Sequence, residues 1–417
     1  MLVSQKNILY LSNEDKQIVD LLCFHSARLY NACCYNIRQY YFNNNTYLPF
    51  KEQYHEIKDN DNFKLLINDS AQQTLRIVDK SYRSFFSLLN LKAKGKYSEN
   101  PSIPRYLDKN SKWSVFVAGR SCRVKNNNIY VGLSKLFREK YDVAKHDIVL
   151  PLPKNVVGKI HQLQIRPICN GKSYEMIIVY EREATLHNLD KNNCLSIDCG
   201  LDNLFTCYDK RNNKSFIIDG KRLKSVNQFF NKQKARLQSI YDKQRIKLSD
   251  SKRFMKLSLK RTNVINEYFN LVVKHIADYC IENNIGTLVM GDFKGIKQDI
   301  NNGSVNNQNF VSIPFFKLKS KLESKCVALG IQYVLQEESY TSKCSCLDLE
   351  DICKKGKYCG RRIKRGLYKS SDGRLINADL NGAVNILRKY YKSKSKNDLS
   401  FDDVRALSMC QPIRIHF

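Results

Sequence analysis

The chain of 417 residues has no apolar run of the roughly 20 residues that a membrane-spanning helix needs. It shows no signal peptide, and its 15 cysteines are odd in number and follow no framework spacing. These absences argue against a disulfide-rich secreted domain, so we expect reduced thiols in a soluble, intracellular protein. The compartment depends on the host, being the cytoplasm in a bacterium, with the nucleus open in a eukaryotic or viral setting.

Acidic residues are scarce: 40 Asp and Glu stand against 70 Lys and Arg, a net charge of +30. Such an excess repels itself and rarely serves folding, whereas it binds polyanions by releasing counterions from their phosphates. Nucleic-acid binding is therefore the favoured interpretation. A basic bias of the whole proteome, which the many Asn, Lys, Ile and Tyr residues suggest, is the alternative.

The first half of the chain predicts helices inserted into a strand-rich region. Residues 1–12 have the pattern of a short strand, and residues 13–99 carry two amphipathic helices. Short strands follow, including a hairpin with an Asn-Gly turn, so we expect a β-barrel domain from residues 1–12 and 100–190. On the second helix, the basic side chains expected to contact nucleic acid are Arg76, Lys80 and Arg83.

The second half has the element order of a ribonuclease-H-like domain, which predicts an α/β fold class beside the β-barrel. Three strands and two long basic helices precede the strand TLVMG, a helix, the strand IQYVLQ and a final helix. We expect this nuclease-like domain to comprise residues 191–339 and 376–392. A Cys-rich basic insert is expected at residues 340–375 and a polar tail at residues 393–417.

Two aspartates occupy positions that are typical of a nuclease metal site. Asp198 lies in the apolar strand segment LSIDCG, where a buried charge is costly unless a cation compensates it. Asp379 stands at the start of an apolar helix. Capping of a turn by Asp198 and plain helix N-capping by Asp379 are the alternatives. Together, on this strand order, the two aspartates favour a metal site.

A third carboxylate is expected at the end of the strand TLVMG, but Gly291 occupies that place. The next strand outward ends in Glu337 and Glu338. Neighbouring strands lie about 4.8 Å apart, so an acid on the outer strand starts roughly 10 Å from the central one. A bent glutamate that passes over a glycine can cover that distance. Alternation favours Glu338 as the ligand, and Asp292, which is predicted to point away, is the rival.

Several segments, among them QQTLRIVDKSYRSFF, IDCGLDNL, GDFKGIKQ and the specific block from GRRIKRGLYKS to INADLNGAVNIL, resemble a known family. They are similar to TnpB, the RNA-guided nucleases of insertion sequences, and to the eukaryotic and viral relatives called Fanzor. The resemblance covers most of the chain. It implies a RuvC nuclease domain with Asp198 and Asp379 as first and third acids, a wedge β-barrel and a helical recognition domain. In one branch the middle glutamate is relocated to the segment ESYTS, which matches Gly291 and Glu338.

The resemblance also implies an activity and partners. Asp198, Glu338 and Asp379 would hold two Mg²⁺ ions for the hydrolysis of double-stranded target DNA. A guide (omega) RNA from the transposon end would supply specificity, and the protein would read a short flanking DNA motif. The alternatives are an inactive RNA-guided repressor, which the intact Glu338 disfavours, and a DNA-joining transposase, which the lack of a helix-turn-helix pattern disfavours.

The insert at residues 340–375 combines cysteines with Lys and Arg. Clustered thiols in a reduced protein suggest Zn²⁺, but the usual pair of CxxC turns is missing, so zinc binding stays open. The cysteines concerned are Cys344, Cys346, Cys353 and Cys359. The basic residues expected to contact the nucleic-acid backbone, with a solvated loop as the alternative, are Arg361, Arg362, Lys364 and Arg365.

Overall fold

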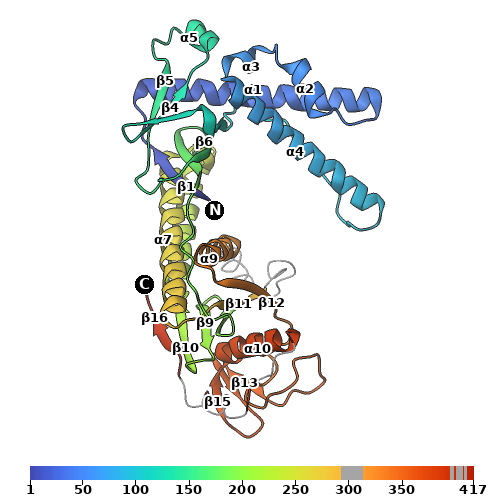
Figure 1. The fold of residues 1–417 in the computed structure, drawn as a ribbon, viewed down its shortest axis with the longest axis vertical. Coiled ribbons are helices and arrows are strands. Elements are labelled where there is room, and N and C mark those ends of the chain that lie inside the picture. Colours follow the sequence, from blue (N-terminus) through green and yellow to red (C-terminus); the bar gives the residue numbers. More distant parts are fainter. Residues whose placement is uncertain (293–312, 395–398, 401–406, 408–410) are drawn as a thin grey trace. The chain divides into compact units, whose positions relative to one another are not determined.

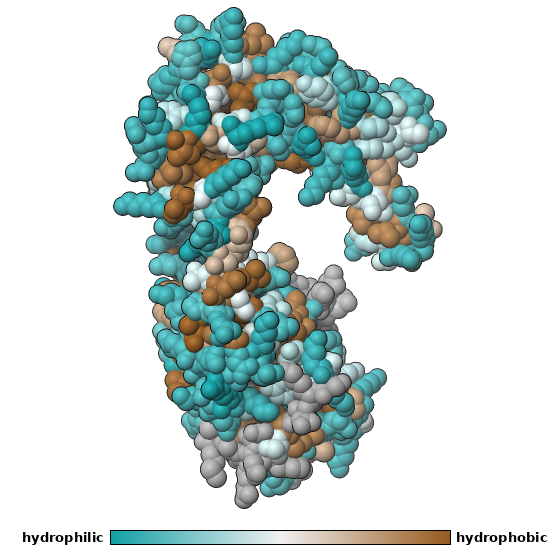
Figure 2. All heavy atoms as spheres, viewed as in Figure 1, coloured by the Kyte–Doolittle hydropathy of each residue, from teal (hydrophilic) through white to brown (hydrophobic). Residues whose placement is uncertain are grey.

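The computed structural model describes residues 1–292, 313–394, 399–400, 407 and 411–417. The chain divides into two compact units, Met1–Glu183 and Ala184–Phe417, each with its own buried apolar core (Figure 1). The segment GDFKGIKQ lies, from residue 293, outside the described residues. Within them, no helix combines the length and apolar character that crossing a bilayer requires. Hydrophilic residues cover much of the face that Figure 2 shows of each unit.

The first unit contains the two long helices that periodicity predicts. Helix α1 begins after Ser12, whose hydroxyl accepts a 3.1 Å hydrogen bond from the Asp15 N–H. Its apolar stripe packs against that of α4, where Leu75 and Val78 are fully buried. The helices of this unit are α1 (Asn13–Asn44), α2 (Phe50–Ile57), α3 (Asp61–Leu65), α4 (Asn68–Ala93) and α5 (Lys135–Tyr141).

The strands of the first unit form two antiparallel sheets. One sheet has the order β1-β7-β6-β2, so the first strand pairs with a strand that follows the helices, as an inserted helical segment requires. The other has the order β3-β4-β5 and joins β2 through η1 (Gly119–Ser121). The strands are β1 (Leu2–Leu9), β2 (Val115–Ala118), β3 (Cys122–Lys125), β4 (Asn128–Gly132), β5 (Asp147–Pro151), β6 (Ile160–Ile168) and β7 (Ser173–Glu181).

The second unit is built on a six-stranded sheet of order β12-β11-β8-β9-β10-β16. Strands β11 and β12 run parallel to the central β8, and β9 runs antiparallel to it, as predicted. The strands are β8 (Cys194–Cys199), β9 (Asn203–Asp209), β10 (Lys214–Asp219), β11 (Thr287–Asp292), β12 (Gln332–Glu337) and β16 (Ile413–Ile415).

Helices cover both faces of this sheet. Leu195 and Ile197 of β8 pack with helices α7 and α9, whereas Val289 and Tyr208 pack with α10 on the other face. The small sheet β13-β14-β15 leads directly into α10. The remaining elements of this unit are α6 (Lys221–Lys243), η2 (Leu248–Asp250), α7 (Lys252–Glu282), α9 (Phe315–Leu329), β13 (Arg361–Lys364), β14 (Leu367–Lys369), β15 (Leu375–Asn377) and α10 (Ala378–Ser393).

The end of the chain differs from the prediction. A polar tail was expected at residues 393–417, but residues 413–415 form β16, which pairs in parallel with β10. Ile415 and Phe417 pack against the core of the second unit, and that apolar burial holds the segment in the sheet. The expectation of a tail is therefore wrong for this part of the segment.

Candidate functional site

Asp198 lies near the end of β8, in the middle of the six-stranded sheet. Its backbone is paired with Thr206 of β9, so the position of the carboxyl is set by the sheet rather than by a turn. Burial, and then the charges of Glu338 and Asp379, raise the pKa of this carboxyl well above its usual range. Glu338 and Asp379 are thus close enough in the folded unit for their charges to act on Asp198.

Glu338 follows the last residue of β12 and turns inward over Gly291. A Cβ added at Gly291 would lie 2.6 Å from Cδ and 2.8 Å from Cγ of Glu338, so the glycine provides the space that the glutamate fills. The Oε1 atom of Glu338 is buried and has no hydrogen-bond partner among the described residues. Burial, followed by the charges of Asp292 and Glu337, raises the pKa of Glu338 to about 7.

Asp379 belongs to the first turn of α10, but it does not cap that helix. The side chain of Asn377 accepts hydrogen bonds from the N–H groups of Asp379 and Leu380, at 3.0 Å and 3.1 Å. The Asp379 carboxylate instead accepts a 2.6 Å hydrogen bond from Nδ2 of Asn203 and lies 3.6 Å from Nη2 of Arg362. The N-capping alternative for Asp379 is therefore wrong, and its carboxylate faces the site.

Helix α10 approaches Asp198 closely because of a glycine. A Cβ added at Gly382 would lie only 2.9 Å from Oδ2 of Asp198. Asp379 stands one turn before Gly382 on the same helix. The glycine in the segment INADLNG therefore allows the helix that carries one acid to pack against the strand that carries another.

The rival Asp292 is in a different situation. Its carboxylate forms a 2.8 Å ion pair with Nζ of Lys319 on α9, and both side chains are only about 15% exposed. A buried charge that already has a cationic partner has little need of a metal ion. This pairing favours Glu338 over Asp292 as the third ligand, although the assignment stays a prediction.

The residues present suit a divalent cation. Carboxylates are the hard oxygen donors that Mg²⁺ prefers, Asp198 is harder to ionise because of burial and of the charges of Glu338 and Asp379, and Glu338 has an unpartnered buried oxygen. Among the described residues, no group of three or more His, Cys, Asp or Glu side chains is gathered tightly enough to hold an ion as it stands. Magnesium at Asp198, Glu338 and Asp379 therefore remains a proposal that rests on donor chemistry.

A buried polar ladder on α10, which the sequence analysis missed, anchors the turn that follows Glu338. The hydroxyl of Thr341 donates a 2.8 Å hydrogen bond to the backbone oxygen of Glu338, and Asn385 Nδ2 donates to the Thr341 oxygen at 2.9 Å. Asn381 and Asn385 both donate to the oxygen of Cys344, at 2.9 Å and 2.8 Å. The sequence contains a signal for this ladder, because Asn381 and Asn385 interrupt an otherwise apolar helix.

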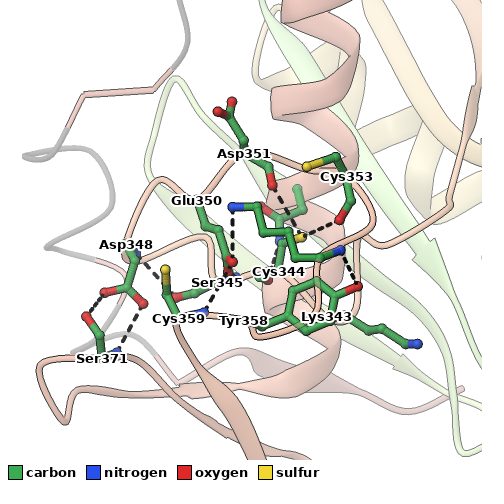
Figure 3. A network of polar contacts seen from close by, with 12 residues as sticks. Lys343, Cys344, Ser345, Asp348, Glu350, Asp351, Cys353, Tyr358, Cys359 and Ser371 are labelled. Carbon is green, nitrogen blue, oxygen red and sulfur yellow. Dashed lines mark hydrogen bonds and ion pairs between the residues drawn. The ribbon is translucent and has the colours of Figure 1, made fainter.

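The Cys-rich insert is organised around a carboxylate (Figure 3). Glu350 is buried and accepts hydrogen bonds from the backbone N–H groups of Ser345 at 2.9 Å and Cys359 at 3.2 Å, and from Lys355 Nζ at 3.3 Å. The thiols are dispersed: Cys344 donates to backbone oxygens, Cys346 packs in the core beside α10, and Cys353 and Cys359 are exposed. Zinc binding by these cysteines stays a prediction, which metal analysis of the purified protein would test.

Three of the seven predicted basic residues line one of two hollows, one hollow in each unit. In the second unit, Arg362 and Arg365 line a hollow of about 640 Å³ beside Asp379. Arg361 and Lys364, on β13 with Arg362, are exposed. Their contact with nucleic acid stays a prediction.

In the first unit, Arg76 lines a hollow of about 320 Å³, and its guanidinium lies 4.7 Å from the centre of the Phe50 ring. Of the other two basic residues expected on α4, Lys80 is exposed and Arg83 pairs with Asp79 at 2.9 Å. Of the three, Arg76 is the residue that lines this hollow.

Two family models match the chain. One, OrfB_IS605, described as a probable transposase, matches residues 177–297, and the other, described as the Cas12f1-like TNB domain, matches residues 315–386. A relative, the TnpB-like protein ORF457 of Acidianus two-tailed virus, is 26% identical over 401 residues, which cover 87% of this chain and 81% of that protein.

Solved structures share the fold. Cas12f1, from a cryo-EM complex with sgRNA and target DNA, superposes with a TM-score of 0.59 at 15% identity, covering 90% of this chain and 83% of its own. The mini-RNA-guided endonuclease CRISPR-Cas_phi3 superposes with a TM-score of 0.53 at 10% identity, covering 93% and 92%. With Asp198 near the end of β8, Glu338 after β12 and Asp379 at the start of α10 of this α/β sheet, and with these matches along its length, the chain is similar to TnpB-like and Cas12f1-like proteins.

Proposed function

We propose that the protein is a transposon-associated, RNA-guided DNA endonuclease. The observation that carries the proposal is the placement of Glu338, whose unpartnered, buried carboxylate oxygen lies against Gly291 and interacts with the charge of Asp198. An inactive descendant would have no reason to keep a buried acid that destabilises the fold. The matched relatives support the proposal, since one solved neighbour is described as an RNA-guided endonuclease.

In the proposed reaction, Asp198, Glu338 and Asp379 would hold Mg²⁺. When bound, two such ions supply an activated water and stabilise the leaving 3′ oxygen of a phosphodiester. The chain's own residues orient the carboxylates: the amide of Asn203 holds Asp379, and the α10 ladder holds the turn after Glu338. Gly291 leaves the space through which Glu338 reaches the centre.

Guidance would be divided between RNA and protein. A guide RNA would pair with the target strand, while the protein reads a short flanking motif. The hollow in the first unit suits the second task, because Gln72, Gln73 and Arg76 of α4 line it beside Lys159 and His161. Gln and Arg are the side chains that pair with adenine and guanine edges in the major groove.

Purification of the protein from cells that carry its native locus tests this function. We expect a defined RNA that ends at the element boundary to co-purify, and the complex to cut matched but not mismatched duplex DNA only when Mg²⁺ is present. A defined RNA with matched binding but no cut would favour the guided repressor. Absence of any defined RNA, with joining of DNA ends, would favour the transposase.

A further inference from the structure

The hollow beside Asp379 is lined by cations from other elements as well as by Arg362 of strand β13. It lies at the end of the sheet where the predicted acids meet, and its volume is about 640 Å³. Four cations and two carboxylates line it, which leaves an excess of two positive charges. These charged residues are Lys221, Arg362, Arg365, Arg414, Asp202 and Asp379.

Arg414 reaches this hollow because the end of the chain is built into the sheet. In the parallel pairing of β16 with β10, Arg414 is the register partner of Ile217. Beyond the strand, the ring of Phe417 packs at 5.9 Å from that of Tyr268 and at 5.6 Å from that of His275. The strand pairing and the packing of the residues after Arg414 hold the backbone from which its side chain extends.

Arg414 is also connected to the acid site by one intervening side chain. Its Nη1 donates a 3.0 Å hydrogen bond to Oδ1 of Asn203, and Nδ2 of Asn203 donates to Asp379 at 2.6 Å. The arginine therefore turns the amide so that its N–H faces the carboxylate. A phosphate that contacts the remaining guanidinium donors would lie directly beside the predicted metal ligands.

The four cations differ in how far they are already neutralised. Arg362 lies 3.6 Å from Asp379, and Arg365 pairs with Asp202. Among the described residues, Lys221 and Arg414 have no carboxylate within ion-pairing distance. These two side chains therefore account for the excess charge, and an anion from outside the chain would balance it.

We propose that Lys221 and Arg414 form a phosphate-binding subsite for the DNA strand that is cut at the neighbouring carboxylates. The inference rests on the proposed function and extends it to two residues and to the C-terminal strand. A phosphodiester fits because the planar guanidinium fork offers paired donors to phosphate oxygens and the ammonium adds a point charge. The exposure of both side chains leaves them accessible to a long polyanion.

The test uses the full chain with its co-purified RNA. Lys221→Gln/Arg414→Gln removes both charges, and Lys214→Gln is the control, because Lys214 is exposed and lies at the start of β10, three residues or about 10 Å along the strand from Ile217, the register partner of Arg414. Arg414→Lys keeps a cation at the same place. We expect the double variant to cut bound, matched DNA about tenfold more slowly than the control. We also expect Arg414→Lys to cut this DNA faster than Arg414→Gln, at a rate close to that of the wild type.

Affinity for a fluorescent single-stranded oligonucleotide provides a readout that needs no cleavage. Each lost phosphate contact should reduce the slope of log affinity against log salt by about 0.7, so the double variant should lose about 1.4. A double variant with the rate and salt slope of Lys214→Gln would overturn the subsite. A wild-type protein that shows the expected slopes but cuts nothing would refute the endonuclease and leave the subsite standing.

Discussion

Two neighbouring parallel strands, β11 and β12, end in carboxylates whose surroundings differ. Asp292 is paired with Lys319. Glu337 pairs with Lys389, and although burial raises its pKa, hydrogen bonds from Lys389 and Ser339 lower it to about 2. Glu338, the next residue, has a pKa raised to about 7 by burial and by acidic neighbours.

The presence or absence of a lysine partner separates acids that the fold already neutralises from an acid that could bind a ligand. A carboxylate with a lysine partner has its charge balanced within the fold, so it contributes to stability and has little attraction left for a ligand. A carboxylate that is buried beside other acids and forms no ion pair of its own keeps an attraction for a cation from outside the chain. Glu338 is the one of the three strand-end acids that meets this condition.

The largest expected effect is the change in the rate of DNA cleavage when Glu338 or Asp292 is replaced by alanine. Glu338→Ala should reduce the rate of guided DNA cleavage at least about a thousandfold, since several kcal/mol of transition-state stabilisation are lost with the ligand. Asp292→Ala should stay within about threefold of the wild type. Single-turnover cleavage at saturating Mg²⁺ measures both. The reverse order would assign the third ligand to Asp292.

The next effect comes from returning a side chain to β11. Gly291→Ala places a methyl group where the Glu338 side chain lies, so the carboxylate must shift. A displacement of about 1 Å at a reacting centre costs roughly a hundredfold in rate. Gly356→Ala is the control, because a Cβ at that position meets no atom within 4 Å. Equal rates for the two variants would show that Glu338 does not need the glycine.

Without metal, substitutions of Asp292 and Glu338 should change the free energy of unfolding in opposite directions. Asp292→Asn leaves Lys319 buried without its partner carboxylate, so the free energy of unfolding should fall by about 1–3 kcal/mol. Glu338→Gln removes a buried, repelled charge and should raise it by roughly 1 kcal/mol at pH 8. Urea unfolding in the presence of a chelator measures both. A loss of stability in both variants would contradict the distinction between them.

The smallest effect concerns Glu337 and acid. Its folded-state pKa, about 2, lies below the ordinary value of 4.5, so its contribution is present above about pH 4.5 and is lost as pH falls toward 2. Because the side chain is 59% exposed, solvent screening keeps this contribution below about 1 kcal/mol. Glu337→Gln should therefore unfold slightly more easily at pH 7 and like the wild type near pH 2. A constant difference across that range would exclude the ion pair as its cause.

Local pattern was enough to predict most of the elements and to name the candidate acids, whose roles stay predictions. Periodicity located the long helices and most strands, because repeats of 2.0 and 3.6 residues are properties of the backbone alone. The spacing of neighbouring strands, which is also a backbone property, predicted that the Glu338 side chain passes over Gly291. The resemblance to TnpB supplied the roles of the acids. A charge in an apolar strand, as at Asp198, is visible without a structure because its burial cost demands compensation.

Tertiary structure decided which polar groups are already satisfied. No local pattern shows that Lys319 neutralises Asp292 or that Arg414 reaches Asn203 from the other end of the unit. These contacts join residues far apart in the chain, and their energies depend on burial, which only the packed fold sets. The sequence by itself therefore determined the strands, helices and acidic residues, and folding determined which of those acids is left for a ligand.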